Sequence, residues 1–514
     1  MMNVCITIIE NPRLPVSLEL SADEVKAVAF AETGQAGTTT LPPIYPEWLG
    51  DRAFSATHGA RFNYVVGEMA RGIATPRMVV EAVRAGCLGF YGSAGLPLEE
   101  IERGLHQIKA ELSADQISWG ANLIHTPQQP GYEAGVVDLF LREGVRRVSA
   151  SAYMRLSPEI VRYTALGLQR GPNGEIVRSN HVFAKVSRAE VAEQFMSPAP
   201  EAILKSLVQS GAISAEQAEL AARVPVAAEI TAEADSGGHT DRRSAAPLFS
   251  SICAARDRTA AKTGIDPETV RIGLAGGIAT PHAVAAAFSM GASYVLTGSI
   301  NQAAVESGLS LSGRQLLAKA GPADVAMAPA ADMFEQGVEV QVLKRGTLFA
   351  MRGKKLFQIY RSGAAFETLD PKEQAWMEDV LGEPFETAWQ ATRDYIRRVN
   401  PKEAERADAD GNKRLALVAR RYLFSGAQLA REGDPGRLAD YQIWCGPAQG
   451  AFNEWVAGTF LEDISNRTVR QIAWNLMEGA ARITRAAQLR AIGVAVPPSA
   501  FNYSPQSFAE SEAA

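Results

Sequence analysis

Cysteine is scarce in this chain, and so are the features typical of secreted, zinc-binding or membrane proteins. The four cysteines, Cys5, Cys87, Cys253 and Cys445, lie far apart in 514 residues and form no CxxC pair. Neither a disulfide framework nor a metal site is therefore expected. The chain has no uncharged apolar run of about 18 residues and no basic segment leading into a long apolar stretch at its start. We therefore expect a cytoplasmic protein that does not span a membrane.

Excess positive charge is also missing, since 51 Lys and Arg stand against 57 Asp and Glu, a formal net charge of −6. A nucleic-acid partner attracted by bulk positive charge is not expected, and an acidic partner needs a local basic patch. The composition, 46% hydrophobic and 21% charged, is typical of a globular protein. The chain is too long for one ordinary domain, so we expect a large domain plus a substantial addition.

Short strand-like runs alternate with helix-compatible stretches from about residue 62 onward. Thr75, Ser157 and Thr280 each precede a proline, which is a helix start with an N-cap side chain and an N1 proline. This alternation predicts parallel strands with crossover helices, and eight units fit a closed (β/α)8 TIM barrel of the α/β class. The eight predicted strands are residues 62–67, 87–92, 118–124, 145–151, 181–187, 228–234, 270–276 and 294–298.

Outside the barrel the pattern predicts a helical insertion after the fifth strand and a mainly helical C-terminal region. Short β-like runs, such as residues 4–9, indicate an N-terminal appendage that contains β-structure. The expected domains are an appendage at 1–50, a barrel at 51–311 with the insertion at 190–225, a mainly helical region at 312–500 and a tail at 501–514.

One βα unit of the chain is repeated. Residues 72–93 read GIATPRMVVEAVRAGCLGFYGS, and residues 277–299 read GIATPHAVAAAFSMGASYVLTGS. Each copy consists of a loop, a capped helix, a glycine turn, a strand and a loop of small residues. Internal similarity of this size is what a barrel built from repeated units shows.

Two glycine-containing loops, AGGIATP (275–281) and TGS (297–299), follow the seventh and eighth predicted strands. Phosphate binds at these loops in many barrels, because backbone N–H groups and a helix N-terminus converge there. The alternative is that both loops are merely tight βα turns. No GxGxxG lies between a strand and a helix, which disfavours a Rossmann dinucleotide site.

Polar residues gather at the ends of three other predicted strands. The loop EADSGGHTD (233–241) contains His239, for which we expect proton transfer, while its aspartates serve equally well as turn caps. Lys185 ends the fifth strand and could stabilise negative charge, or form a plain ion pair. Asn122 could hydrogen-bond the edge of a planar ring. His125 and His58 are weaker candidates for a functional role than His239, and the favoured interpretation is that both are ordinary loop residues.

The segment KRGTLFAMRGKK (344–355) carries Lys344, Arg345, Arg352, Lys354 and Lys355 without an acidic residue. On a net-acidic protein, this is the patch that could meet a phosphate or an acidic carrier protein. The alternative is a solvated helix face.

Several long segments resemble the PfaD-type trans-acting enoyl reductases of polyunsaturated fatty acid synthases and trans-acyltransferase polyketide synthases. The barrel alone is similar to a wider FMN group that includes nitronate monooxygenases and the flavin-containing enoyl-carrier-protein reductase. The segments that carry the resemblance are EADSGGHTD, AGGIATP, YVLTGSINQA, AGPADVAMAPAADMFEQGVEVQVLKRGTLFAMRGKKL and DYQIWCGPAQGAFNEW.

This resemblance implies an FMN cofactor, NADPH as electron donor and an enoyl thioester on an acyl carrier protein as substrate. The implied partners are acyl carrier protein domains of a synthase, and a homodimer is a further expectation. His239 and Lys185 are the implied catalytic residues. Glu68 and Arg71 depart from the smaller or apolar residues common in the wider group. The residues implied to surround FMN are Met69, Ala70, Gly72, Asn122, Lys185, Gly237, Gly238, Gly276, Gly277, Gly298 and Ser299.

Two other functions remain open at this point. A nitronate monooxygenase-like flavin oxidase would use the same barrel without NADPH or a carrier protein, but it gives the long helical region no role. A catalytically silent synthase subunit would use the barrel as a scaffold, although its loop set is intact.

Overall fold

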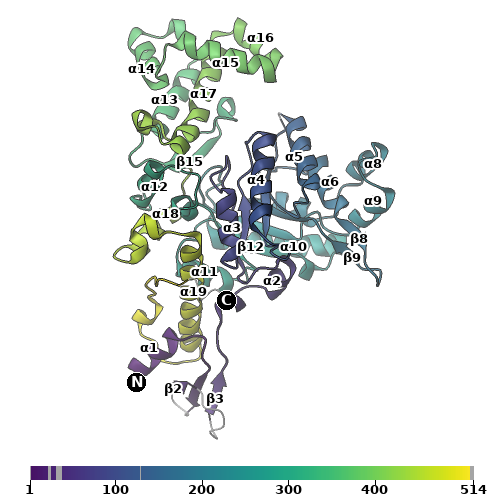
Figure 1. Cartoon of the computed structure of the whole chain (residues 1–514), viewed down its shortest axis with the longest axis vertical. Helices are drawn as coiled ribbons and strands as arrows, with labels where there is room; N and C mark the ends of the chain where they lie inside the picture. The colour runs from purple at the N-terminus through teal and green to yellow at the C-terminus, as the bar shows by residue number, and fades with distance from the viewer. Residues whose placement is uncertain (1, 21–24, 31–37, 128, 510–514) are drawn as a thin grey trace. The chain divides into compact units, whose positions relative to one another are not determined.

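The computed structural model in Figure 1 describes residues 2–20, 25–30, 38–127 and 129–509. The chain divides into two compact units. Unit one comprises residues 1–235, 241–308 and 454–514, and unit two comprises residues 236–240 and 309–453. These limits differ from the expected domains, because the chain returns to unit one after residue 453 and gives five loop residues to unit two.

Unit one is built on a closed barrel of eight parallel strands, which confirms the predicted TIM barrel. Each strand lies within its predicted run and is joined to the next by helical segments. The strands are β4 (Tyr64–Val66), β5 (Leu88–Tyr91), β6 (Trp119–Ile124), β7 (Arg147–Ser151), β10 (His181–Val186), β11 (Glu229–Glu233), β12 (Arg271–Ala275) and β13 (Val295–Thr297).

The helices of the barrel begin where the sequence places them. The side chains of Thr75, Ser157 and Thr280 accept hydrogen bonds from backbone N–H groups three residues later, which confirms the three N-caps. The helices are α3 (Pro76–Arg84), α4 (Leu98–Glu111), α5 (Pro130–Arg142), α6 (Pro158–Leu166), α7 (Ala189–Met196), α10 (Ala245–Thr263) and α11 (Pro281–Ser289).

An insertion follows α7, as predicted. It contains the helices α8 (Glu201–Gln209) and α9 (Ala215–Ala221), and Ser214 and Gln217 form a capping box at the start of α9. The sequence did not predict the small hairpin of β8 (Leu168–Arg170) and β9 (Ile176–Arg178) that precedes β10.

Aromatic side chains fill the barrel interior. Helix α2 (Arg52–His58) contributes Phe54, which stacks on Tyr294 with 4.5 Å between ring centroids. Phe183 meets Phe54 and Phe90 edge-on at 6.0 and 5.0 Å. All four rings are buried, so the barrel is a packed core on which the loops at its carboxyl end are held.

The N-terminal appendage differs from its prediction in one element. Residues 4–9 were expected to be β-like, but they lie in helix α1 (Met2–Glu10). Ile8 and Ile9 of this helix pack in a core cluster with Ala486 and Leu489 of α19 (Val469–Ala491). Tertiary packing therefore decides the conformation of a short apolar run that periodicity alone cannot assign.

Strands of the appendage and helix α19 complete unit one. The strands β1 (Val16–Leu20), β2 (Val25–Phe30) and β3 (Thr38–Leu41) form an antiparallel sheet in the order β2-β1-β3. Helix α19 packs against α11 and α3 of the barrel. The C-terminal helix thus belongs to the barrel unit, although it follows unit two in sequence.

Unit two combines a two-stranded antiparallel sheet with helices, which confirms a mainly helical C-terminal region. The sheet consists of β14 (Val325–Pro329) and β15 (Glu339–Leu343), and α13 packs against β14. Its apolar core joins side chains of β14, β15, α13, α14, α15, α16 and α17. The helices are α12 (Leu311–Ala318), α13 (Phe349–Arg361), α14 (Pro371–Leu381), α15 (Phe385–Val399), α16 (Pro401–Ala409), α17 (Gly411–Glu432) and α18 (Ala448–Val456), within which the division of the units falls.

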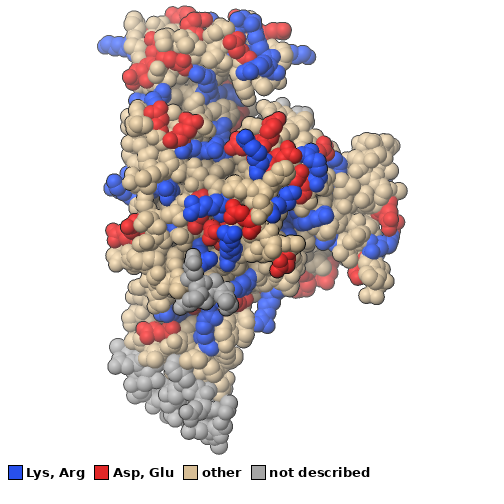
Figure 2. All heavy atoms as spheres, viewed as in Figure 1, with Lys and Arg blue, Asp and Glu red and all other residues tan. Residues whose placement is uncertain are grey.

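Acidic and basic side chains are intermixed over the face drawn in Figure 2. A charged partner that approaches this face therefore meets local clusters rather than one broad field of a single sign. Among the residues that the structure describes, no helix is both long and apolar enough to cross a membrane.

Candidate active site

Loops at the carboxyl ends of the barrel strands contain unusual backbone conformations. Among the described residues, the non-glycine residues with positive φ are Arg71, Ala152 and Arg242, at 59°, 61° and 53°. They lie in the loops after β4, β7 and β11, at the end of the barrel that carries active sites in enzymes of this fold. Left-handed backbone costs about 1–2 kcal/mol for such residues, so its concentration here indicates a functional surface.

The loop after β12 combines a required turn with open space. Gly276 has φ +79°, and a Cβ there would lie 2.6 Å from the carbonyl carbon and oxygen of Ala234. No described atom lies within 4 Å of a Cβ built on Gly277 or Gly298. The N-terminus of α11 follows directly, with Thr280 as its cap. Two glycines at adjacent strand ends therefore leave room for an anion beside a helix N-terminus.

Hydrogen bonds anchor the neighbouring loop after β13. The Thr297 hydroxyl lies 2.7 Å from the hydroxyl of Tyr64, and Asn301 Nδ2 donates to the carbonyl oxygen and Oγ1 of Thr297 at 3.2 and 3.0 Å. Ser299 opens the short 3-10 helix η3 (Ser299–Ala303) beside Gly298. The glycine surface is thus held by a rigid support.

The loop after β4, with Met69, Ala70 and Gly72, is joined to the loop after β5. Gly72 N–H donates to the carbonyl oxygen of Gly92 at 2.8 Å. A Cβ on Gly92 would lie only 1.9 Å from the Met69 oxygen, so only glycine permits this approach. Met69 is 8% exposed. The backbone here is fixed by contact between two loops.

Lys185 of β10 lies between two carboxylates. Its Nζ is 2.9 Å from Glu68 Oε1 and 3.3 Å from Glu233 Oε1. Burial lowers the pKa of the Lys185 ammonium, but Glu233 and Glu68 outweigh burial and hold this pKa above its ordinary value. Lys185 is therefore a permanent cation, able to stabilise negative charge but unable to accept a proton near neutral pH.

The sequence singled out Glu68 and the loop that begins at Glu233, but it did not predict that both residues pair with Lys185. Glu233 ends β11, which pairs directly with β10, whereas Glu68 follows β4 and comes close to Lys185 only because the barrel closes. The plain ion pair and the charge-stabilising role expected for Lys185 are compatible, because an ammonium has three donors.

Asn122 of β6 is 3% exposed, and its amide is oriented by neighbouring β7. Nδ2 donates to the Ser149 carbonyl oxygen at 3.0 Å and to Ser151 Oγ at 2.9 Å. The backbone oxygen of Asn122 accepts from Ser93 Oγ at 2.7 Å. Both amide hydrogens are therefore used within the barrel, so Oδ1 is the atom with which Asn122 could recognise a ligand.

The glycine-histidine loop belongs to unit two. Gly238 and Gln341 of β15 exchange backbone hydrogen bonds of 2.9 and 2.8 Å. A Cβ on Gly237 would lie 2.7 Å from the Cys445 nitrogen, which makes glycine necessary there. His239 Nε2 lies 3.4 Å from Asp332 Oδ1. Segments far apart in the sequence thus assemble around His239, and Asp332 is a partner that the sequence did not indicate.

The basic segment 344–355 is only partly free for a partner. Arg352 pairs with the buried carboxylate of Asp440, and Lys355 Nζ lies 3.9 Å from the centroid of the Trp376 ring. Arg345 Nη1 lies 3.1 Å from Asp324. Lys344 and Lys354 are exposed. Arg352 is therefore occupied within unit two, whereas the other four cations remain candidates for docking.

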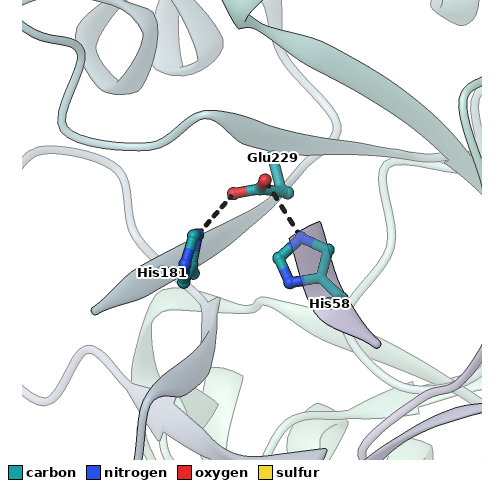
Figure 3. A group of neighbouring side chains, drawn as sticks. All are labelled: His58, His181 and Glu229. Atoms are coloured by element: carbon teal, nitrogen blue, oxygen red, sulfur yellow. Dashed lines mark hydrogen bonds and ion pairs between the residues drawn. The ribbon is translucent and has the colours of Figure 1, made fainter. Parts of the chain in front are cut away.

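A second polar cluster lies at the opposite, amino-terminal end of the barrel strands (Figure 3). His58 Nε2 is 3.1 Å from Glu229 Oε1, and His181 Nδ1 is 4.0 Å from Glu229 Oε2. Arg271 donates to the same carboxylate, and Arg147 Nε donates to His58 Nδ1 at 3.0 Å. Because His58 Nδ1 accepts this bond, Nε2 carries the ring proton and donates to Glu229.

This arrangement fits a structural network better than a metal site. The three ligand atoms are close enough to hold an ion, but the Nε2 lone pair of His58 is replaced by an N–H, and Arg271 already neutralises the carboxylate. Burial lowers the pKa of His58, and it lowers the pKa of His181 to about 3, so both rings are neutral near pH 7. Polar groups at this end of such a barrel serve stability.

Comparison with known proteins gives the following relatives. A polyunsaturated fatty acid synthase subunit of Thraustochytrium sp. is 41% identical over 502 residues, which are 96% of this chain and 33% of the relative. The polyketide biosynthesis protein PksE of Bacillus subtilis is 41% identical over 444 residues, 86% of this chain and 56% of the relative. This chain thus spans about a third to just over half of these relatives.

Solved structures and one family profile match as well. The enoyl reductase domain of MlnA, from the macrolactin biosynthesis cluster of Bacillus amyloliquefaciens, is 37% identical with a TM-score of 0.81, over 87% of this chain and 99% of that domain. FabK of Thermotoga maritima, 17% identical with a TM-score of 0.51, shares the fold over 86% of this chain and 98% of its own. The profile of the acyl-carrier-protein S-malonyltransferase inserted helical domain matches residues 364–441.

Proposed function

The chain belongs to the family of PfaD-type trans-acting enoyl reductases, and from this premise we propose that it reduces enoyl thioesters on acyl carrier protein, with FMN as cofactor and NADPH as electron donor. The observation that carries the proposal is the likeness to the MlnA enoyl reductase domain over 99% of that domain. The pathway is polyketide or polyunsaturated fatty acid biosynthesis, the setting named for the relatives.

The glycine loops fit the phosphate of FMN. Gly277 and Gly298 offer open space, Gly276 sets the turn, and the N-terminus of α11 supplies N–H groups and a favourable dipole. Ser299, next in the chain, adds a hydroxyl at this position. We assign the phosphate to these residues of the loops after β12 and β13.

The ring of the flavin would be held at the ends of β4, β6 and β10. The joined loop with Met69, Ala70 and Gly72 supplies a fixed backbone, and Asn122 Oδ1 is a buried acceptor for a ring N–H. Lys185 supplies a permanent cation close to this surface. When bound, the flavin supplies hydride transfer between NADPH and the substrate.

The chain itself must position the thioester and handle charge and protons. Addition of hydride to the β-carbon moves negative charge onto the thioester oxygen, which a fixed cation such as Lys185 stabilises. Gly237 and Gly238 set the course of the loop that carries His239. His239, held near Asp332, orients the substrate or donates a proton to it.

The carrier protein would dock on Lys344, Arg345, Lys354 and Lys355. Carrier proteins are generally acidic and carry a phosphopantetheine phosphate, so a local basic cluster on a net-acidic enzyme favours the encounter. All four of these residues lie in unit two.

The cofactor assignment has a direct test. We expect the purified protein to be yellow and to release FMN, rather than FAD, on denaturation, as identified by chromatography with authentic standards. Anaerobic NADPH should then bleach the bound flavin. A colourless protein that takes up no added FMN would contradict the proposed function.

A further inference from the structure

A buried carboxylate–imidazole pair lies at the carboxyl ends of β6 and β7. His125 directly follows the last residue of β6, and its Nδ1 lies 2.9 Å from Oε2 of Glu133 in α5. The Glu133 side chain is 3% exposed, and that of His125 is 11% exposed. The pair is therefore shielded from bulk water and lies three residues beyond Asn122, at the active end of the barrel.

Glu133 is surrounded by hydrogen-bond donors. Tyr153 donates to Oε1 at 2.9 Å, Ser157 also donates to Oε1, and the Thr126 N–H donates to Oε2 at 3.4 Å. Burial raises the pKa of Glu133, but hydrogen bonds from His125, Ser157 and Tyr153 outweigh burial and hold this pKa below its ordinary value. An ionised carboxylate only accepts hydrogen bonds, so His125 Nδ1 must carry a proton.

The ring of His125 is fixed in position as well as in tautomer. It stacks on the ring of Tyr153 with 4.8 Å between centroids and 18° between planes, and its backbone N–H donates to the Ser151 oxygen. Ala152, between Ser151 and Tyr153, has φ +61°. The loop thus accepts a strained conformation while it presents Tyr153 to both His125 and Glu133.

The second ring nitrogen of His125 remains available. None of the described residues forms a hydrogen bond with Nε2, which lies across the ring from the nitrogen held by Glu133. His58 differs, because Arg147 and Glu229 occupy both of its ring nitrogens. A ring with one nitrogen anchored to a buried carboxylate and the other free is the arrangement of a general acid or base.

We propose that His125 donates the proton that the substrate α-carbon takes up, with Glu133 as the residue that positions it; this rests on the proposed function. Hydride addition to the β-carbon converts the enoyl thioester into an enolate. The Nε2–H bond of the His125 imidazolium then breaks as the α-carbon–hydrogen bond forms. The ring becomes neutral, and its Nδ1–H still donates a hydrogen bond to Glu133. A water molecule then returns a proton to Nε2. His239 is left with the orienting role.

The test is single-turnover formation of saturated product from a crotonyl carrier-protein thioester by the NADPH-reduced holoenzyme, between pH 5.5 and 9. For His125→Gln we expect a loss of about 10²–10⁴-fold, the usual contribution of general acid catalysis. The loss should be seen at every pH in this range, because the amide of Gln is not an acid that can supply the proton. Glu133→Gln should also slow product formation, and the neutral His125 ring of this variant should lose its preference for protonation at Nδ1, which nitrogen NMR detects.

His106→Gln is the matched control, because His106 also pairs with a glutamate, Glu143, at 3.1 Å but is 56% exposed on α4. This variant should keep the wild-type rate and pH profile. NADPH reduction of the flavin, which needs no proton at the α-carbon, should be unchanged in all variants.

Two failures can be told apart. If wild-type protein forms no saturated product, the proposed function is contradicted; if wild type turns over and His125→Gln matches it at every pH, only the role of His125 is contradicted. Nitrogen NMR of the histidines in the wild-type protein is a second test, and it does not depend on whether any variant folds. It should show the neutral His125 ring protonated at Nδ1, and protonation at Nε2 alone would overturn the proposal.

Discussion

Single glycines of the proposed phosphate site have distinct tasks. Gly276 is needed for backbone geometry, because its φ is +79° and a Cβ would collide with Ala234. Gly298 has a negative φ of −124°, and a Cβ built on it would meet no neighbouring atom within 4 Å. Substitutions at Gly276 therefore report on folding, and substitutions at Gly298 report on the ligand.

Gly298→Asp should weaken FMN binding, whereas Gly298→Ala should keep it. The carboxylate would face the phosphate, and like charges about 4 Å apart cost about 1–4 kcal/mol, which corresponds to roughly five- to thousand-fold in affinity. Fluorescence titration of the apoprotein with FMN measures both dissociation constants. Equal FMN affinities in the two variants would contradict the assignment of the phosphate to this loop.

Lys185→Met should lower both stability and turnover, for separable reasons. Removal of the ammonium leaves Glu68 and Glu233 without their shared partner, which costs about 3–5 kcal/mol when a buried pair is broken. The double change Lys185→Met with Glu68→Gln should recover much of this stability, since one of the two carboxylates becomes neutral.

Turnover of that double variant should stay low if Lys185 stabilises developing charge. Urea unfolding gives the stability, and single-turnover reduction of an enoyl thioester gives the rate. Recovery of both together would show that Lys185 acts only as the structural partner of the two glutamates.

Figure 3 shows Glu229, at the amino end of β11, between His181 of β10 and His58 of α2, and Arg271 of β12 pairs with the same carboxylate. Glu229→Gln should destabilise unit one by about 3–5 kcal/mol, because Arg271 would lose the buried partner of its charge. Glu143→Gln, at an exposed pairing, should cost less than about 1 kcal/mol. Equal unfolding midpoints in urea for the two variants would contradict the structural role of the network.

The same network predicts acid sensitivity. An unfolded histidine takes up a proton near pH 6.5, whereas burial lowers the pKa of folded His181 to about 3. Between these values the unfolded chain holds more protons, so stability falls as pH falls, by about 1.4 kcal/mol per pH unit for each such histidine. His181→Gln should flatten the dependence of unfolding free energy on pH between 6.5 and 4. An unchanged slope would contradict a neutral buried His181.

The start of α13 and the turn before it carry the docking prediction. Neutralising Lys344, Arg345 and Lys354 together should raise KM for carrier-bound substrate and leave turnover of a small pantetheine thioester nearly unchanged. Added salt should likewise raise KM for the carrier-bound substrate, because at ordinary ionic strength the attraction between exposed charges is screened beyond about 8–10 Å. Arg352 is left intact, since it pairs with the buried carboxylate of Asp440. Equal weakening for both substrates would assign the segment to folding or to the active site.

The sequence predicts those elements that depend on residues close together in the chain, and it fails where contacts between distant segments decide the structure. The eight strands and the N-caps at Thr75, Ser157 and Thr280 follow from short-range patterns and were predicted. Residues 4–9 lie in a helix, and Ile8 and Ile9 of this helix pack with Ala486 and Leu489 of α19, which is far away in sequence. Glu68 and Asp332 were not predicted as partners, because barrel closure brings Glu68 to Lys185 and a long-range contact brings Asp332 to His239. Glu133 was not predicted either, although it lies only 8 residues after His125, because no local pattern shows that the start of α5 packs against the end of β6.

The division of the chain into two units has one consequence for function. Residues 236–240, with Gly237, Gly238 and His239, follow β11 of the barrel in sequence but belong to unit two. The remaining proposed site residues for cofactor and catalysis lie in unit one. Gln341 Nε2 donates to the carbonyl oxygen of Ser236 at 2.9 Å, so Gln341→Ala should affect the loop that carries His239 and leave the phosphate loops of unit one unchanged.

The most direct test of enoyl reduction is a single turnover. The protein, reduced anaerobically with one equivalent of NADPH, is mixed with a crotonyl thioester of an acyl carrier protein, and the acyl group is identified by mass spectrometry. We predict butyryl product, with a mass increase of two hydrogens, in an amount equal to the reduced flavin. Unchanged crotonyl carrier protein, together with oxygen consumption on a nitronate without NADPH, would contradict enoyl reduction and identify an oxidase.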